Sequence, residues 1–168
     1  MNPLLKTDFY KTGHWQQYPK GTEYVYSNFT PRSMKHFNGV NKNQIVWFGL
    51  QAVISEMTTD WALNFFDKPK HEVIGEYVGV LKDSLGVSTV ETARIEQLHD
   101  LGYLPIRIKA LPEGFWVNAG VPVFTITNTL PEFYWIVNFL ETSLSANLWK
   151  LSTTATIAAN YRLILDKW

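Results

Sequence analysis

Three stretches along the chain have the pattern of strands. In residues 22–29 (TEYVYSNF) β-branched and aromatic residues alternate with polar ones, and residues 105–111 (PIRIKAL) show the same period of two. Residues 115–117 and 121–127 also favour strands and flank a turn at residues 118–120. Because a short turn between two such runs is typical of neighbouring strands that pair, we expect an antiparallel pair or a curled sheet there.

Between these strands the hydrophobic residues recur with the period of a helix. A second helix is expected over residues 72–85, ending at Gly86, since glycine is favoured just past a helix end. Ser88 and Glu91 have the spacing of a capping box, which predicts a third helix from there to about Leu101. The first helix is expected within residues 44–66, where the apolar residues at helical spacing are Val46, Leu50, Val53, Ile54, Met57 and Trp61.

The chain from residue 128 to its end predicts two more helices. Asn128 or Thr129 can cap a helix with Pro131 in its first turn, where a missing N–H costs nothing. Its apolar residues are Trp135, Phe139, Leu140, Leu144 and Leu148. The final helix has an apolar stripe that needs a partner, formed by Ile157, Tyr161, Ile164, Leu165 and Trp168. It has no Gly, Asn or Pro stop, so we expect a truncated chain rather than a naturally frayed terminus.

Composition and charge narrow the class of protein. A chain of 168 residues, 46% of them hydrophobic, can form one α+β domain with a packed core. Fifteen basic residues balance fifteen acidic ones, which argues against a broad nucleic-acid-binding face. The absence of cysteine excludes disulfides, thiolate catalysis and zinc–thiolate sites. There is no signal-peptide pattern and no long apolar run, so we expect a soluble, cytoplasmic protein with no membrane partner.

Seven Trp, eight Tyr and ten Phe make the chain rich in aromatic residues. Most of these aromatic residues are expected in the core, and their unusually large number is also compatible with an obligate interface to another subunit. Standard catalytic motifs are missing: there is no Gly-rich phosphate loop and no Gly-x-Ser-x-Gly. The four His residues lack the spacing of metal ligands.

Two clusters of polar and aromatic residues are candidates for a binding site. Arg32, Lys35 and His36 follow a predicted strand and suit a phosphate, although a solvated basic loop would have the same composition. The other cluster could stack on a ring and bind an anion, or could be a terminal arm packed on the domain. It consists of Asp8, Phe9, Tyr10, Lys11, His14 and Tyr18.

Several segments, in order, resemble the N-terminal region of nicotinamide phosphoribosyltransferases. They are TDFYKTGHWQQYPKGTEYVYSNFTPR, VWFGLQ, LPIRIKALPEGFWVNAGVPVFTITNTLPEFYWIVNFLET and LWKLSTTAT. Residues 58–101 match weakly. Discrimination from nicotinate phosphoribosyltransferases depends mainly on His14 with Gln17, Tyr18 and Pro19.

The resemblance implies transfer of a ribosyl phosphate from phosphoribosyl pyrophosphate to nicotinamide. The products would be nicotinamide mononucleotide and pyrophosphate, a step of NAD salvage, with Mg²⁺ on the pyrophosphate. In this family dimers share their active sites. Tyr10 matches a Tyr that stacks on nicotinamide in the neighbouring subunit, Asp8 matches an Asp beside that site, and Arg32 matches an Arg that reaches toward substrate phosphates. The other site residues of the family lie beyond Trp168, so no catalytic residue and no metal ligand is assigned in this chain.

The resemblance also implies the domain organisation. Residues 1–150 would be the N-terminal α/β domain of a type II phosphoribosyltransferase, with a mostly antiparallel sheet and flanking helices. Residues 151–168 would begin the connection into a catalytic α/β barrel that is largely absent from the chain. Two alternatives stay open: a nicotinate phosphoribosyltransferase, and a non-catalytic partner or dimerisation fragment.

Overall fold

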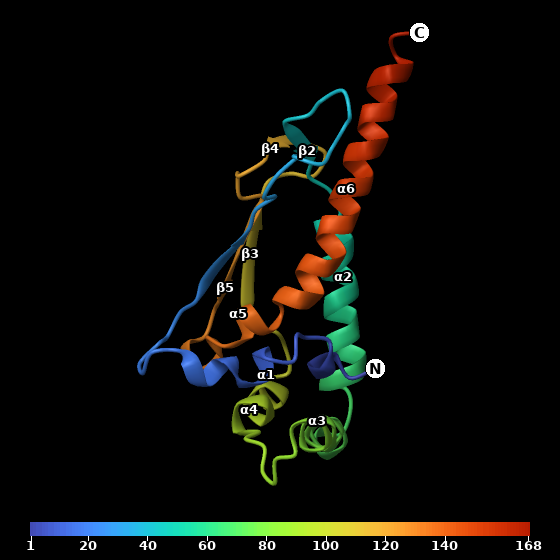
Figure 1. Cartoon of the computed structure of the whole chain (residues 1–168). Helices are drawn as coiled ribbons and strands as arrows, with labels where there is room; N and C mark the ends of the chain where they lie inside the picture. Colours follow the sequence, from blue (N-terminus) through green and yellow to red (C-terminus); the bar gives the residue numbers. More distant parts are fainter.

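The fold is a mixed α+β arrangement without a closed barrel, and the computed structural model describes the whole chain, residues 1–168 (Figure 1). The strands are β1 (Tyr26–Phe29), β2 (Gln44–Val46), β3 (Ile106–Ala110), β4 (Trp116–Asn118) and β5 (Phe124–Asn128). The α-helices are α1 (Lys11–His14), α2 (Leu50–Trp61), α3 (Lys70–Leu85), α4 (Ala93–Leu101), α5 (Ile136–Phe139) and α6 (Glu141–Leu165). Short 3₁₀ turns occur at Pro3–Leu5, Trp15–Gln17 and Pro131–Phe133, and a π-helical turn, Ala62–Phe66, extends α2.

The strands form two antiparallel sheets, as the alternating pattern indicates. One sheet has the order β1-β5-β3, with Ser27 and Ile108 both opposite Ile126, and the other pairs β2 with β4. The expected pairing of residues 115–117 with residues 121–127 is wrong, because β4 and β5 belong to different sheets. The turn exists, but Pro122 has no N–H to extend a hairpin ladder, and Val123 N–H instead donates to Phe29 O at 2.9 Å.

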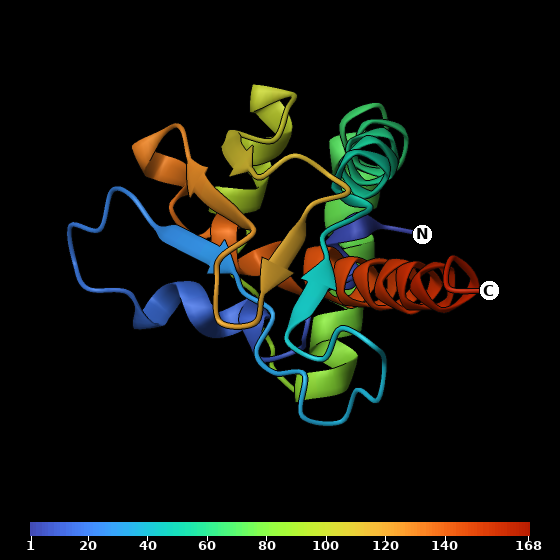
Figure 2. The ribbon, with the colours of Figure 1, turned by 90° about the horizontal axis from the view of Figure 1, so that it is seen from above.

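Helices α2 and α6 lie side by side and run in opposite directions, on one side of the two sheets (Figures 1 and 2). Aromatic residues fill the space between sheet and helices: Phe29 stacks on Phe124 with ring centroids 5.3 Å apart, and Trp47 lies 5.9 Å from Phe124. Leu144 and Leu148 of α6 are buried in the same core. The aromatic surplus in the sequence is therefore partly explained by this core.

Two helix starts differ from the sequence expectation, and one expected helix end is confirmed. Residues 44–46 form β2, and α2 begins only after Gly49, whose left-handed φ of 103° favours glycine at this position. Helix α4 begins at Ala93 rather than at a Ser88–Glu91 capping box, since the Glu91 carboxylate pairs with Arg94. The expected end of α3 at Gly86 is confirmed, with φ of 65°.

The two helices expected near the C-terminus are divided differently. Pro131 does open a helical turn, but Asn128 does not cap it: its side chain accepts from Val25 N–H and donates to Glu23 O and Leu130 O. After a break around Leu140, α6 is one continuous helix of 25 residues that passes through position 150. The division of the chain at residue 150 stays a prediction.

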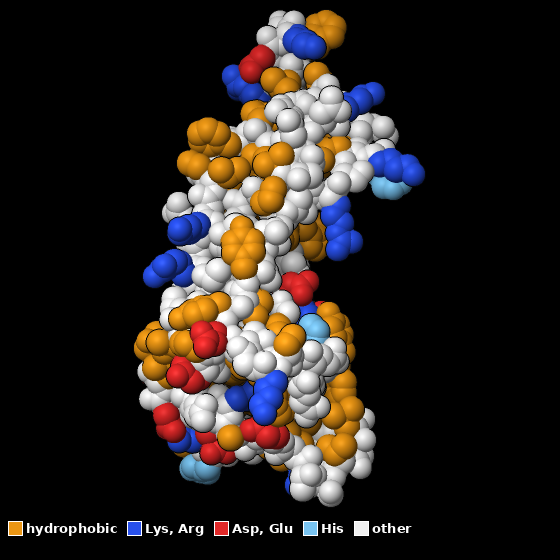
Figure 3. Space-filling view, turned by 90° about the vertical axis from the view of Figure 1, so that its left-hand side faces the viewer, with side chains coloured by type: hydrophobic (Ala, Val, Ile, Leu, Met, Phe, Trp, Pro, Cys, Tyr) orange, Lys and Arg blue, Asp and Glu red, His pale blue; other side chains and the backbone are white.

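The end of α6 leaves its apolar stripe exposed, as the sequence pattern indicates. Exposed large hydrophobic residues there are Ile157, Tyr161, Ile164, Leu165 and Trp168. In Figure 3 a hydrophobic side chain is visible at the uppermost tip of the molecule, where the chain ends. None of the helices combines the length and the apolar character needed to cross a lipid bilayer.

Candidate substrate-binding surface

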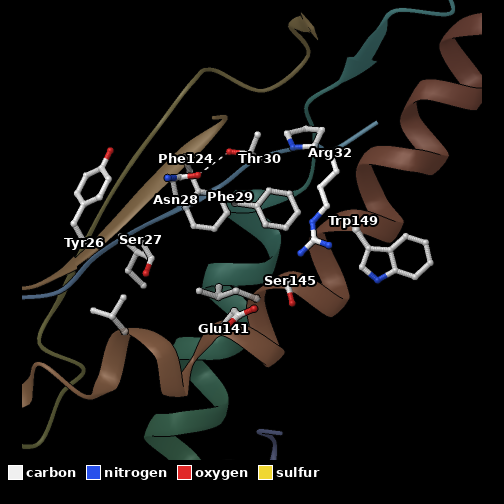
Figure 4. Close-up of a pocket in the computed structure, with 14 residues that line it drawn as sticks. Tyr26, Ser27, Asn28, Phe29, Thr30, Arg32, Phe124, Glu141, Ser145 and Trp149 are labelled. Atoms are coloured by element: carbon white, nitrogen blue, oxygen red, sulfur yellow. Dashed lines mark hydrogen bonds between the residues drawn. The ribbon is translucent and has the colours of Figure 1, made fainter. Parts of the chain in front are cut away.

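Arg32 points into a groove between β1 and the first half of α6 (Figure 4). The groove has a volume of about 760 Å³ and is lined on one wall by residues 26–32. On the facing wall, α6 contributes Glu141, Leu144, Ser145 and Trp149. The Arg32 side chain is exposed and takes part in no hydrogen bond or ion pair, so its guanidinium is free to bind an anion.

The chemistry of the groove suits a ligand with both charged and flat parts. Trp149 is 59% exposed and presents its indole ring beside Arg32. Ser145 and Asn28 add polar groups that can donate or accept. A planar guanidinium next to an aromatic ring is a favourable arrangement for a phosphate attached to a ring-bearing molecule.

A second, more open groove lies on the other side of Arg32 and contains further cations. It has a volume of about 580 Å³ and includes Arg32, Lys35 and Lys42, with no acidic residue in its lining. His36, grouped with Arg32 in the sequence, is not part of this lining. On the face shown in Figure 3 most Lys and Arg side chains lie in the upper half, and most acidic ones in the lower half.

Asp8 and Tyr10 lie at the start of α1, which packs on the junction of α5 and α6. The Asp8 carboxylate accepts from the Thr142 hydroxyl at 2.8 Å, and Asp8 N–H donates to the same hydroxyl at 3.1 Å. The Thr7 hydroxyl donates to Phe139 O at 2.9 Å. By contrast, the Tyr10 side chain is 61% exposed. The segment is therefore a packed arm, and it presents the Tyr10 ring to the outside.

Lys11 connects this arm to the Arg32 groove. Its side chain is 1% exposed, and its ammonium lies 2.7 Å from Glu141 Oε2 and 3.4 Å from Asp8 Oδ2. Glu141 in turn lines the groove into which Arg32 points. The two parts of the predicted site, Asp8 with Tyr10 and Arg32, are thus linked through one buried cation.

An aromatic series continues from Tyr10 toward the sheet. The Tyr10 and His14 rings meet edge-on at 5.8 Å, His14 lies 5.8 Å from Tyr18, and Tyr18 lies 5.2 Å from Tyr134. Asn138 Nδ2 donates to the Tyr18 hydroxyl. Burial raises the pKa of Tyr18 above its usual value, although this hydrogen bond partly opposes the shift, so the hydroxyl stays protonated at neutral pH.

A second cation, Arg94 of α4, holds the arm from the opposite side. Its Nη2 donates to Thr12 O at 3.1 Å, and its guanidinium lies 4.5 Å from the centroid of the Trp15 ring and 5.5 Å from that of Trp135. Cation–π contacts of this kind are stronger where the cation is shielded from water. The segment that carries Tyr10 is therefore fixed at both ends.

Sequence reasoning missed the partners Glu141, Trp149 and Arg94, because they lie more than eighty residues from the arm or the loop that they serve. Lys11 was visible only as a member of a cluster; its spacing of three from Asp8 on a helical turn was the available signal. No group of three or more His, Asp or Glu side chains in the structure could hold a metal ion.

Comparisons with known proteins find similar sequences among nicotinamide phosphoribosyltransferases. The family described as nicotinamide phosphoribosyltransferase, N-terminal domain, matches residues 2–68. A nicotinamide phosphoribosyltransferase of Acinetobacter baylyi is 51% identical over 100% of this chain and 34% of its own length. That of Xanthomonas campestris pv. campestris is 32% identical over 98% of this chain and 32% of its own length.

A solved structure supports the fold independently. The crystal structure of human nicotinic acid phosphoribosyltransferase matches 94% of this chain and 28% of its own chain, with a TM-score of 0.65 and 25% identity. The present chain spans about a third of the length of the curated relatives. By sequence, the chain is similar to the N-terminal third of these nicotinamide phosphoribosyltransferases.

Proposed function

We propose that the chain forms part of an enzyme that transfers ribosyl 5-phosphate from phosphoribosyl pyrophosphate to nicotinamide. The products are nicotinamide mononucleotide and pyrophosphate, and the step belongs to NAD salvage in the cytoplasm. The observation that carries the proposal is 51% identity, over the entire chain, to a curated nicotinamide phosphoribosyltransferase. The residues matched to that family's substrate contacts are accessible: Tyr10 and Asp8 are exposed, and Arg32 is unpaired in a groove.

Each of these side chains has a role that its chemistry supports. Arg32 binds and neutralises phosphate oxygens, because a guanidinium offers two parallel N–H donors to them. Tyr10 stacks on the pyridine ring, and Asp8 lies beside it. In-line displacement at a sugar carbon requires the ring nitrogen to be held in place, which is what a fixed aromatic ring supplies. Mg²⁺ bound to the pyrophosphate group of the substrate would help to neutralise the charge of that group.

We further propose that the complete enzyme is a homodimer in which Tyr10 and Asp8 serve the neighbouring subunit. The exposed Tyr10 ring on a firmly packed arm supports this arrangement, since a substrate or subunit can reach the ring without disturbing the core. Because the chain spans about a third of its relatives, the chain alone is expected to be inactive.

A chimera tests the proposal directly. This chain replaces the matching N-terminal third of the Acinetobacter baylyi protein, and formation of nicotinamide mononucleotide is measured for the chimera and for the isolated chain. We expect activity within about tenfold of the parent for the chimera, a loss of no more than ~1.4 kcal/mol in transition-state stabilisation, and none for the isolated chain. A folded, dimeric chimera without activity would contradict the proposal and favour a non-catalytic partner fragment. Appreciable turnover by the isolated chain would contradict the expected dependence on the remaining two thirds.

Nicotinate is the second candidate substrate. The structural match to human nicotinic acid phosphoribosyltransferase supports it. Initial rates of the chimera with nicotinamide and with nicotinate, at equal concentration, separate the two. A preference for nicotinate would overturn the choice of the amide while leaving the reaction class intact.

A further inference from the structure

The groove that contains Arg32 has one positive and one negative side chain on facing walls. Arg32 is the only cation that lines it, and Glu141 is the only carboxylate. In Figure 4 both side chains extend toward the space between β1 and α6. A phosphate that approaches Arg32 would therefore be repelled by Glu141 unless the charge of this carboxylate were compensated elsewhere.

Lys11 supplies this compensation from outside the groove. Its ammonium lies 2.7 Å from Glu141 Oε2 and 3.3 Å from the Thr142 hydroxyl, and its side chain is almost completely buried. A buried ammonium is stable only while it keeps its counter-charges, so the contact also fixes the direction in which Glu141 points. Arg32 is left without an intramolecular partner.

We propose that Lys11 is a positioning residue for phosphate binding: it holds and neutralises Glu141, so that Arg32 stays available to a ligand with phosphate groups. The same ammonium contacts Asp8 and so fixes the arm that presents Tyr10. The inference rests on the proposed role of Arg32 in the phosphoribosyltransferase reaction. It adds a residue that does not itself touch the ligand but sets the charge of the groove.

The proposal predicts opposite effects for the two members of the ion pair. Lys11→Gln leaves Glu141 uncompensated and free to turn toward Arg32, so the affinity for an anion should fall, by roughly threefold to tenfold at low ionic strength. Glu141→Gln removes the negative wall while Lys11 stays, so affinity should hold or rise. The double variant Lys11→Gln/Glu141→Gln should return to about the wild-type affinity. If Lys11 served only to pack the arm on α6, breaking the pair from either side would have the same effect.

The experiment is a calorimetric titration with inorganic pyrophosphate at low ionic strength. It uses the purified chimera in which this chain replaces the matching N-terminal third of the Acinetobacter baylyi protein. The difference in pyrophosphate affinity between wild type and Arg32→Gln gives the contribution of the Arg32 groove to binding. Lys82→Gln is the matched control, because it removes the same charge from an exposed position on α3 that forms no ion pair. Thermal unfolding of each variant confirms that it is folded at the temperature of the titration.

The outcomes distinguish the role proposed for Lys11 from the role proposed for Arg32. Weakening by Lys11→Gln with recovery in the double variant supports the inference. Binding that depends on Arg32 but changes in the same direction in Lys11→Gln and Glu141→Gln, or in neither, overturns the inference and leaves the role of Arg32 intact. Absence of any Arg32-dependent binding overturns the role of Arg32 and the inference with it.

Discussion

The hydroxyl of Thr156 accepts a hydrogen bond of 2.8 Å from the backbone N–H of Val46, so a helix closes the free edge of a sheet. The same face of α6 repeats the contact one turn away on each side: Ser152 Oγ donates to Phe48 O at 3.1 Å, and Asn160 Oδ1 accepts from Asn41 N–H at 2.8 Å. These side chains of α6 are buried although they are polar. They satisfy backbone groups of the short strand β2 and its flanks that β4 cannot reach.

Thr156→Val should therefore destabilise the protein by about 1–3 kcal/mol, because it keeps the shape of the side chain and leaves a buried N–H without an acceptor. Thr153→Val is the matched control, since the Thr153 hydroxyl is exposed and bonds only to Trp149 O of its own helix. Urea unfolding of both variants gives the comparison. Equal stability of the two variants would mean that the contact with Val46 contributes nothing measurable.

This contact illustrates why part of the fold was not predictable from sequence. Ser152, Thr156 and Asn160 interrupt the apolar pattern of α6, so the sequence indicated a boundary between two helices within what the structure shows as one helix. These polar residues are explained by a tertiary contact. They face the backbone of β2 and its flanks, which lie more than one hundred residues earlier in the chain. A local pattern of hydrophobic and polar residues indicates which side chains are buried, but not which part of the chain they pack against.

Strand pairing, too, could not be predicted from local sequence patterns alone. The runs around residues 106–110 and 124–128 were correctly predicted as strands, because alternation is a local property. The partner of β4, however, is β2, and the partners of β5 are β1 and β3. For the candidate site, the family resemblance supplied Tyr10, Asp8 and Arg32, whereas Glu141 and Arg94 became visible only when distant segments were brought together.

Stability should decline at alkaline pH through Tyr77. Its side chain is fully buried and its hydroxyl has no hydrogen-bonding partner, and burial raises its pKa, although the charge of Arg94 partly opposes the shift. In the unfolded chain a tyrosine ionises near pH ~10, so above that pH the unfolded state releases a proton that the folded state retains. The free energy of unfolding contributed by Tyr77 is therefore complete below this pH and is lost as the pH rises from there to the folded-state pKa.

Tyr77→Phe isolates this effect. Because the hydroxyl is unpaired, the variant should differ from wild type by less than about 1 kcal/mol at neutral pH, and should unfold less readily than wild type at alkaline pH. Urea unfolding of both proteins at neutral and alkaline pH provides the test. Because both proteins contain the same lysines, the effect of lysine titration cancels when their free energies of unfolding are subtracted. A constant difference across this range would show that Tyr77 does not titrate with a raised pKa.

Arg32→Ala in the active chimera should impair use of phosphoribosyl pyrophosphate more than binding of the pyridine. A charge-assisted hydrogen bond contributes roughly 1.5–3 kcal/mol, so kcat/KM for the phosphate substrate should fall about ten- to a hundred-fold. Arg107→Ala is the control, because Arg107 is also exposed and forms no ion pair, but lies on β3 outside the Arg32 groove. An unchanged KM and kcat for the phosphate substrate would make Arg32 an ordinary surface residue.

Tyr10 should act through its ring rather than its hydroxyl. No hydrogen bond of the Tyr10 hydroxyl is found, and the ring is mostly exposed. Aromatic pairing contributes about 0.5–1.5 kcal/mol beyond the area that it buries, so Tyr10→Phe should stay within a few-fold of wild type. Tyr10→Ala should lose at least about tenfold, and part of the loss should appear in kcat, because the ring also orients the reacting nitrogen. Tyr103→Ala, at an exposed tyrosine just past α4, controls for the loss of surface area.

A mixing experiment then tests whether Tyr10 serves the neighbouring subunit. Chimeric subunits with Tyr10→Ala are combined with subunits that carry an inactivating substitution in the remaining two thirds, and the heterodimers are confirmed by mass. If Tyr10 reaches across the interface, one of the two sites in each heterodimer receives an intact ring and an intact second part. Activity should then recover to roughly half that of the unmodified dimer, because shared sites behave as complementary halves. Heterodimers as inactive as both parents would mean that Tyr10 acts, if at all, within its own subunit.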